Sequence, residues 1–141
     1  MGDHFQPQPP PAANDKPAVW DLVVQDLERD EAPLSTLKAP FPWSTRDLMA
    51  LVRADARARD AQGRKRYGVP LQAGNGRDAP VDAYQEALDL AVYLRQALEE
   101  HASRFVPDAE LYVREHLSGL YNIALHSVWR LRWLLFSRDG R

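Results

Sequence analysis

The stretch "RDAPVDAYQEALDLAVYLRQALEE", residues 77–100, decides the fold class, because its apolar residues recur with the period of an α-helix. Asp78 and Pro80 are start signals, since an aspartate suits the N-cap and proline suits the first turn. We predict a helix from near Asp78 to about Ser103. Its apolar arc contains Ala83, Ala87, Leu90, Ala91, Leu94, Ala97 and Leu98.

Three further segments are predicted to form helices. Residues 17–32 begin with a proline and stop before another, and residues 44–63 open with the capping-box pattern "STRD" and close at a glycine. A fourth helix starts at Pro107, has acidic residues in its first turn, and runs almost to Gly140. No segment shows the sustained alternation of a β-strand. The sequence therefore predicts an all-α protein, a bundle of about four main helices.

The N-terminal segment has a different composition. Five of the eleven prolines lie in residues 1–17, among Gln, Asn and Asp, so the segment buries too little apolar area to offset its ordering entropy. We expect residues 1–16 to form a flexible tail whose first fourteen residues are dispensable for stability. Residues 17–141 then form a single helical domain, a normal size for one hydrophobic core.

Composition excludes several classes of function. The net charge of −2 provides no field to attract a polynucleotide or an anionic membrane, and no apolar run is long enough to cross a bilayer. The chain has no cysteine, which excludes disulfides, thiolate catalysis and Cys-ligated zinc, and its four histidines lack metal-site spacing. We expect a soluble cytoplasmic protein.

Three carboxylates lie on the side of the helix opposite the apolar arc. Asp82, Glu86 and Asp89 stand at i, i+4 and i+7, so they share one face. The stripe is either a solvated acidic face or part of a metal site. Tyr93 continues the stripe, and the apolar residues Val81 and Val92 flank it.

Two other aspartates fall on apolar stripes. Asp26 follows Leu22 and Val23, and Asp55 follows Leu51 and Val52, so the helical wheel directs both carboxylates inward. A buried carboxylate requires an arginine, a capping donor or a metal ion.

A basic loop, "GRKRYGVPLQAGNGRD", joins the second predicted helix to the helix at 78–103. Its arginines and lysine suit phosphate binding, while its glycines equally suit the turns of a solvated loop. Tyr67 either stacks on a base or anchors the loop in the core. The basic residues are Arg64, Lys65, Arg66 and Arg77.

The run "YQEALDLAVYLRQAL", preceded by "RYGVPLQAGNGRD", resembles a helix of MazG-like proteins, the all-α nucleoside-triphosphate pyrophosphatases, and small phage and actinobacterial proteins near that superfamily. In the superfamily an E-x-x-E pair and an E-x-x-D pair on successive helices hold Mg²⁺. Water then attacks the nucleotide to give a monophosphate and pyrophosphate. The resemblance covers about residues 50–100, and Glu86-Ala-Leu-Asp89 matches E-x-x-D. It implies Mg²⁺, or Mn²⁺ as a substitute, on Glu86 and Asp89.

The chain also departs from the superfamily pattern, because no E-E-x-x-E motif precedes Glu86. The expected further ligand or water-orienting base is Asp82 or Asp55. The expected nucleotide contacts are Lys65, Arg66, Tyr67 and Arg77.

Two functions follow as expectations. The first is a nucleotide-binding, Mg²⁺-dependent nucleoside-triphosphate pyrophosphohydrolase. The second is a noncatalytic helical adaptor on the same scaffold. The helix at 107–137 is apolar nearly all round, which in either case predicts a homo-oligomer formed through it.

Overall fold

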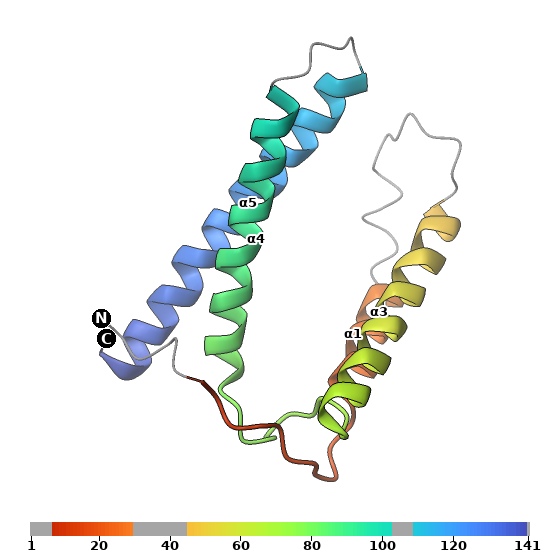
Figure 1. Cartoon of the computed structure of the whole chain (residues 1–141), viewed down its shortest axis with the longest axis vertical. Helices are drawn as coiled ribbons and strands as arrows, with labels where there is room; N and C mark the ends of the chain where they lie inside the picture. The colour runs from red at the N-terminus through yellow and green to blue at the C-terminus, as the bar shows by residue number, and fades with distance from the viewer. Residues whose placement is uncertain (1–6, 30–44, 103–108, 141) are drawn as a thin grey trace. The chain divides into compact units, whose positions relative to one another are not determined.

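The computed structural model describes residues 7–29, 45–102 and 109–140, and within them the chain is all-α. The helices are α1 (Val19–Arg29), α3 (Thr45–Tyr67), α4 (Ala79–Ala102) and α5 (Ala109–Asp139) (Figure 1). An isolated antiparallel bridge between Ala18 and Gln72 is the one β feature of these residues. The predicted fold class is confirmed. None of the helices in the described ranges combines the length and apolarity needed to cross a bilayer.

The start of α4 follows the sequence signals. The side chain of Asp78 caps the helix, since its Oδ1 accepts a hydrogen bond from the amide of Val81 at 3.3 Å. The helix is described as far as Ala102, and its predicted end near Ser103 lies outside the described residues. The predicted start of the fourth helix at Pro107 lies outside the described residues, and its end before Gly140 is confirmed.

The predicted end of the second helix at Gly63 is wrong, because α3 continues to Tyr67. The last turn contains Arg64, Lys65 and Arg66, good helix formers whose charges also interact favourably with the C-terminal end of the helix dipole. A single glycine inside a helix costs only about 1 kcal/mol. The helix is terminated instead by the residue that follows Tyr67, Gly68, which has a φ of 75° and whose amide donates to the carbonyl of Arg64 at 2.8 Å.

The described residues form two compact units, Gln8–Arg77 and Asp78–Arg141. In the second unit, α4 and α5 pack side by side as an antiparallel pair (Figure 1). Small side chains at the contact allow a close approach of the two backbones. The buried residues are Val81, Ala87 and Ala91 of α4, and Ala124 and Leu135 of α5.

In the unit Gln8–Arg77, α1 packs against α3 (Figure 1). Val24 of α1 is buried, as are Met49 and Ala56 of α3. Arg57 Nη1 lies 2.9 Å from Asp21 Oδ1, an exposed ion pair that joins the two helices.

A strap rich in proline and alanine, residues 9–18, runs along the loop at residues 71–77 of the same unit. The amide of Ala12 donates to the carbonyl of Asn75 at 2.8 Å, and the amide of Val19, the first residue of α1, donates to the carbonyl of Leu71 at 2.8 Å. This part of the predicted tail is therefore hydrogen-bonded to the loop. Residues 1–6 lie outside the described residues.

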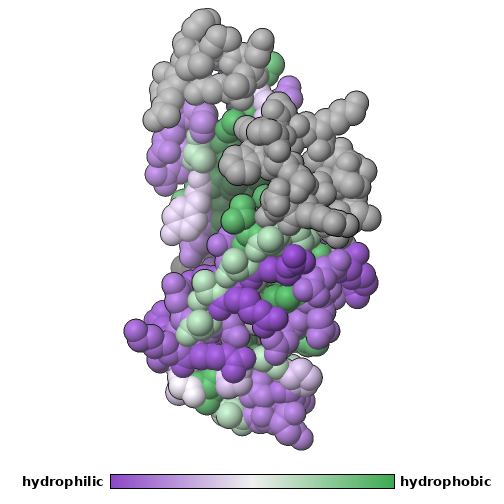
Figure 2. Space-filling model, turned by 90° about the vertical axis from the view of Figure 1, so that its right-hand side faces the viewer, coloured by the Kyte–Doolittle hydropathy of each residue, from purple (hydrophilic) through white to green (hydrophobic). Residues whose placement is uncertain are grey.

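Large apolar side chains reach the surface of both units, between hydrophilic ones (Figure 2). In the unit Gln8–Arg77 they include Leu22 and Leu51, and in the unit Asp78–Arg141 they are concentrated on α5.

Candidate functional site

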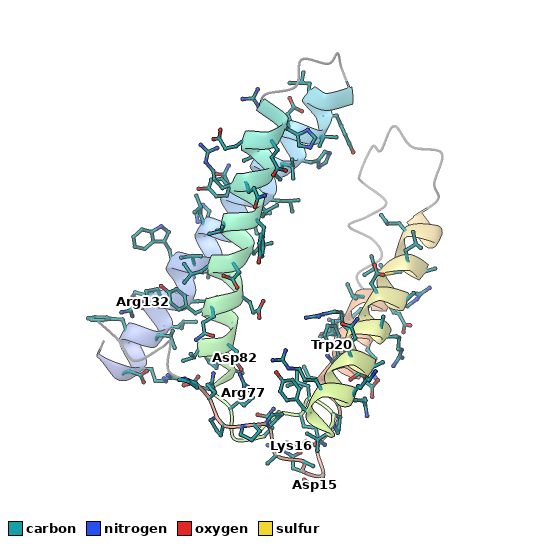
Figure 3. All side chains as sticks on the ribbon, in the orientation of Figure 1. Asp15, Lys16, Trp20, Arg77, Asp82 and Arg132 are labelled. Atoms are coloured by element: carbon teal, nitrogen blue, oxygen red, sulfur yellow. The ribbon has the colours of Figure 1, made fainter. Side chains whose placement is uncertain are left out.

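The acidic stripe of α4 lies where the sequence predicts it. Ala87 and Ala91 are buried against α5, and Glu86 and Asp89 are exposed on the opposite side of the helix. Asp82 lies in the first turn (Figure 3) and is half-buried. Tyr93 continues the stripe and is also exposed.

Glu86 and Asp89 differ from the other acidic residues of α4 in their surroundings. Arg95 forms an ion pair with Glu99, Gln96 Nε2 donates to Glu100 Oε1 at 2.8 Å, and Asp82 also takes part in an interaction. Within the described part of the chain, the side chains of Glu86 and Asp89 form neither a hydrogen bond nor an ion pair. Two carboxylates one helical turn apart are thus left without a compensating cation.

The described residues contain no group of three or more Asp, Glu or His side chains that could together hold a metal ion. Asp55, a candidate for the missing ligand, lies exposed on α3 and belongs to the unit Gln8–Arg77. A metal ion held by the pair on α4 would have two protein ligands, and the rest of its coordination shell would come from water and phosphate oxygens.

The inward orientation predicted for Asp26 and Asp55 is wrong, since both residues are exposed. Asp26 forms an ion pair with Arg29 at 2.8 Å, as expected if an arginine compensates it. The wheel failed because α1 and α3 bury only a narrow stripe around Val24, Met49 and Ala56, so residues at its edge reach solvent.

Among the acidic residues of this unit whose burial the structure describes, the buried one is Asp60 of α3. Its Oδ1 and Oδ2 each accept a hydrogen bond from Arg64 Nε at 3.0 Å, one helical turn away. The i, i+4 spacing of Asp60 and Arg64 was a usable sequence signal for this pair. The charge of Arg64 is therefore compensated by Asp60, and Arg64 differs in this from Lys65 and Arg66.

Three of the predicted nucleotide contacts lie together at the end of α3. Lys65, Arg66 and Tyr67 are all exposed. The guanidinium carbon of Arg66 lies 5.3 Å from the centroid of the Tyr67 ring, a cation–π contact between neighbours. Exposure of Tyr67 means that its ring does not anchor the loop in a core, the alternative that the sequence had left open.

Arg77 lies just before α4 and is held by the loop and the strap (Figure 3). Its amide donates to Asn75 Oδ1 at 3.0 Å, and its Nη1 donates to the carbonyl of Pro9 at 3.1 Å. The side chain predicted to bind phosphate therefore already donates one hydrogen bond to the strap.

Two buried polar residues that the sequence did not single out organise this loop, Gln72 and Asn75. The Nε2 of Gln72 donates to the carbonyl of Asn14 at 2.7 Å and to that of Lys16, while its Oε1 accepts from the amide of Asn14 at 2.9 Å. Asn75 stands between Gly74 and Gly76, whose φ values are 70° and 86°. Those flanking glycines were the available signal for a tight, organised turn.

An ion-pair cluster joins the start of α4 to the end of α5. Arg138 of α5 donates to Asp78 at 2.9 Å and also pairs with Asp139. The hydrogen bond from Arg138 is the main reason that the pKa of Asp78 lies below its usual value, and the Val81 amide acts in the same direction. The same two carboxylates raise the pKa of Arg138, which stays charged at any pH of interest.

Comparison of the chain with protein-family models, with curated proteins and with solved structures returns no match.

Proposed function

We propose that the protein is a MazG-like nucleotide-binding protein that holds Mg²⁺ on Glu86 and Asp89. The observation that carries the proposal is the pair of exposed carboxylates one turn apart on α4, which have no cation partner within the described residues. A cation would relieve their mutual repulsion, and Mg²⁺ prefers such hard oxygen ligands.

The donor set suits Mg²⁺ better than a metal that requires a closed protein cage. Mg²⁺ commonly binds through one or two carboxylates, keeps several waters, and takes its other ligands from substrate phosphates. Bound there, the ion would neutralise phosphate charge. The proposed reaction is hydrolysis of a nucleoside triphosphate: water attacks the α-phosphorus, the bond to the bridging oxygen of the β-phosphate breaks, and a monophosphate and pyrophosphate leave.

The roles of the remaining residues follow from their chemistry. Asp82 lies one turn before Glu86 on the same helix, which favours it over Asp55 as the water-orienting base. Lys65 and Arg66 are exposed cations for phosphate, and Tyr67 offers an exposed ring for a base. Arg77 would have to exchange its hydrogen bond to Pro9 for one to phosphate. Such metabolism of small nucleotides fits a cytoplasmic location.

The test is a metal titration followed by thermal unfolding. An ion that binds only the folded state adds RT ln(1 + [L]/Kd) to its stability, about 2.7 kcal/mol at a hundredfold excess over Kd. We expect millimolar Mn²⁺ or Mg²⁺ to raise the Tm of the parent chain and to leave the Tm of Glu86→Gln and Asp89→Asn unchanged. Without metal, each variant should be at least as stable as the parent, because a repulsion has been removed.

Glu99→Gln is the matched control, since Glu99 is an exposed acid of the same helix that is paired with Arg95. It should keep the full metal response. Release of pyrophosphate from a panel of nucleoside triphosphates should disappear in the Glu86 and Asp89 variants. An equal response to metal in the parent and in both variants would make the stripe a solvated face and remove the case for an enzyme.

A second candidate function, a helical adaptor that self-associates through α5, is favoured by a separate observation. Large apolar side chains of α5 are exposed, among them Ile123, Trp129, Trp133 and Phe136. Exposed apolar surface on this scale marks an interaction site more often than a monomer surface. Self-association is compatible with either function, and sedimentation of the purified chain tests it.

A further inference from the structure

The strap is attached to the loop at residues 71–77 in two places that differ in burial. In its second half, the buried side chain of Gln72 donates to the carbonyls of Asn14 and Lys16 and accepts from the amide of Asn14. Hydrogen bonds in a buried site are costly to break, because the separated groups lose their partners without gaining water. We call this attachment the anchor, and it holds the second half of the strap in place.

The first half of the strap is attached at the surface. Arg77 Nη1 donates to the carbonyl of Pro9 at 3.1 Å, and the amide of Ala12 donates to the carbonyl of Asn75 at 2.8 Å. Pro9 and Ala12 are exposed, so water replaces each partner when these bonds break. We call this attachment the clip. It shares no hydrogen bond with the anchor, so it can open while the anchor stays closed.

The composition of the clip favours its displacement by an anion. Residues 9–11 are three consecutive prolines, which lack an amide hydrogen and offer only carbonyl acceptors. The Pro9 carbonyl is a single dipolar acceptor for the Arg77 guanidinium. A phosphate brings a full negative charge and accepts two parallel hydrogen bonds from an arginine. Phosphate therefore competes effectively with Pro9 for this donor.

We infer that the clip is an autoinhibitory contact, in which the Pro9 carbonyl occupies the Arg77 guanidinium until the polyphosphate of a nucleotide displaces it. The inference rests on the nucleotide-binding function proposed above, in which Arg77 contacts phosphate. It adds that the chain carries its own competitor for that contact. Polyphosphate binding then releases the first half of the strap from the loop, while the anchor keeps the second half folded.

The anchor also makes the competition reversible. Five residues separate Pro9 from Asn14, so the released end stays within about 18 Å of the anchor. The effective concentration of a group tethered this closely is on the order of millimolar. The clip therefore closes again when the phosphate leaves.

Deleting residues 1–10 removes the Pro9 carbonyl and keeps the anchor. A competitor lowers the apparent affinity of a ligand in proportion to the fraction of molecules in which the competitor is bound, and one surface hydrogen bond shifts an equilibrium by roughly two- to tenfold. We therefore expect this deletion to tighten the binding of ATP and of inorganic tripolyphosphate about three- to tenfold, as measured by isothermal titration calorimetry.

Deleting residues 1–8 is the matched control, because it keeps Pro9 and should leave both affinities unchanged. It also removes Gln8, which takes part in an interaction of its own, so the control separates that interaction from the clip.

The variant Arg77→Met identifies the group for which the strap competes. In this background, deleting residues 1–10 should no longer change the affinity, because the carbonyl and the phosphate have lost their shared donor. Lys65→Met should weaken binding but keep the effect of the deletion. Lys65 is an exposed cation of α3 that makes no hydrogen bond to the described residues of the strap.

Amide hydrogen exchange follows the clip directly. Tripolyphosphate should accelerate exchange of the Ala12 amide, which belongs to the clip. The Asn14 amide belongs to the anchor and should stay protected. This measurement decides the question if Arg77→Met does not fold, since it uses the parent chain alone.

Three results would refute the clip and retain the proposed function: equal polyphosphate affinities of the parent and of the chain without residues 1–10, an effect of the deletion that persists beside Arg77→Met, or exchange at Ala12 that polyphosphate does not alter. The proposed function fails together with the clip if neither the parent nor the shortened chain binds ATP or tripolyphosphate at millimolar concentration.

Discussion

At the scale of single residues, the polar interior of the loop at residues 71–77 is the least expected feature. The side chain of Gln72 makes hydrogen bonds to backbone groups of Asn14 and Lys16. In a turn or at a helix cap, such backbone groups normally pair with groups close to them in the sequence. A buried side-chain amide is stable only when its donors and acceptors are paired, so the strap and the loop depend on each other.

Gln72→Ala should lower the free energy of unfolding by about 1–2 kcal/mol, because it removes three hydrogen bonds and leaves strap carbonyls in a part-buried site. Urea unfolding measures this change. Gln96→Ala is the control, since Gln96 is exposed and donates only to a neighbouring carboxylate on its own helix, and it should change stability by less than about 0.5 kcal/mol. Equal effects in the two variants would mean that the strap contributes nothing to folding.

At the same scale, Glu86 and Asp89 show which properties of a site a sequence pattern predicts and which it does not. Their helical spacing and their exposure opposite the packed face follow from the sequence and are confirmed. Their lack of a cation partner within the described residues does not follow from it, because an arginine on another helix could have compensated them. Their role as metal ligands stays a prediction.

At the scale of elements, the ends of the helices depend on charges as well as caps. Asp78 both caps α4 and receives Arg138 from the end of α5, so one carboxylate stabilises a helix start and a helix–helix junction. The pKa of Asp78 is lowered, so the carboxylate contributes stability above its unfolded pKa, near 3.8, and loses that contribution as the pH falls through the folded pKa below that value.

Arg138→Met should therefore lower the Tm at neutral pH and make a progressively smaller difference as the pH falls below 3.8. Thermal unfolding of parent and variant from pH 7 downward measures the difference between them. Arg130→Met is the control: Arg130 is an exposed arginine of the same helix that forms no ion pair with the described residues. A Tm difference that does not depend on pH would show that Arg138 stabilises the helix pair by packing alone.

At the scale of the whole molecule, the N-terminal segment has the composition of a tail but also holds a loop of the folded unit by hydrogen bonds. Its proline and polar residues predict a tail, yet residues 9–18 supply hydrogen-bond partners to a loop some sixty residues later in the chain. Extended, proline-containing backbone leaves its carbonyls unpaired, which allows them to accept hydrogen bonds from Gln72 and Arg77.

Two truncations distinguish a dispensable tail from a strap that stabilises the fold. Deleting residues 1–6 removes none of the described hydrogen bonds and should leave the Tm unchanged. Deleting residues 1–16 removes the partners of Gln72, Asn75 and Arg77 and should destabilise the protein by about 1–3 kcal/mol. Thermal unfolding distinguishes them, and a neutral effect of the longer deletion would restore the expectation of a dispensable tail.

The all-α class, the start of α4 and the exposed acidic stripe were determined by the sequence alone. Each depends on residues within a few positions of one another, where periodicity, a cap or a proline decides the conformation. The end of α3 was missed although its signals were local, because the cost of Gly63 is smaller than the gain from the turn that follows it.

Only the tertiary structure decided which polar groups are buried and which apolar groups are not. Asp26 and Asp55 reach solvent because their helices bury a narrow stripe, and Trp129 and Trp133 reach it because α4 covers one side of α5. Gln72 is buried because the strap returns to it across a separation of 58 residues from Asn14. Burial depends on the width and direction of each contact between elements, and a helical wheel supplies neither, since it gives the angle of a side chain about its own axis but not the position of the neighbour.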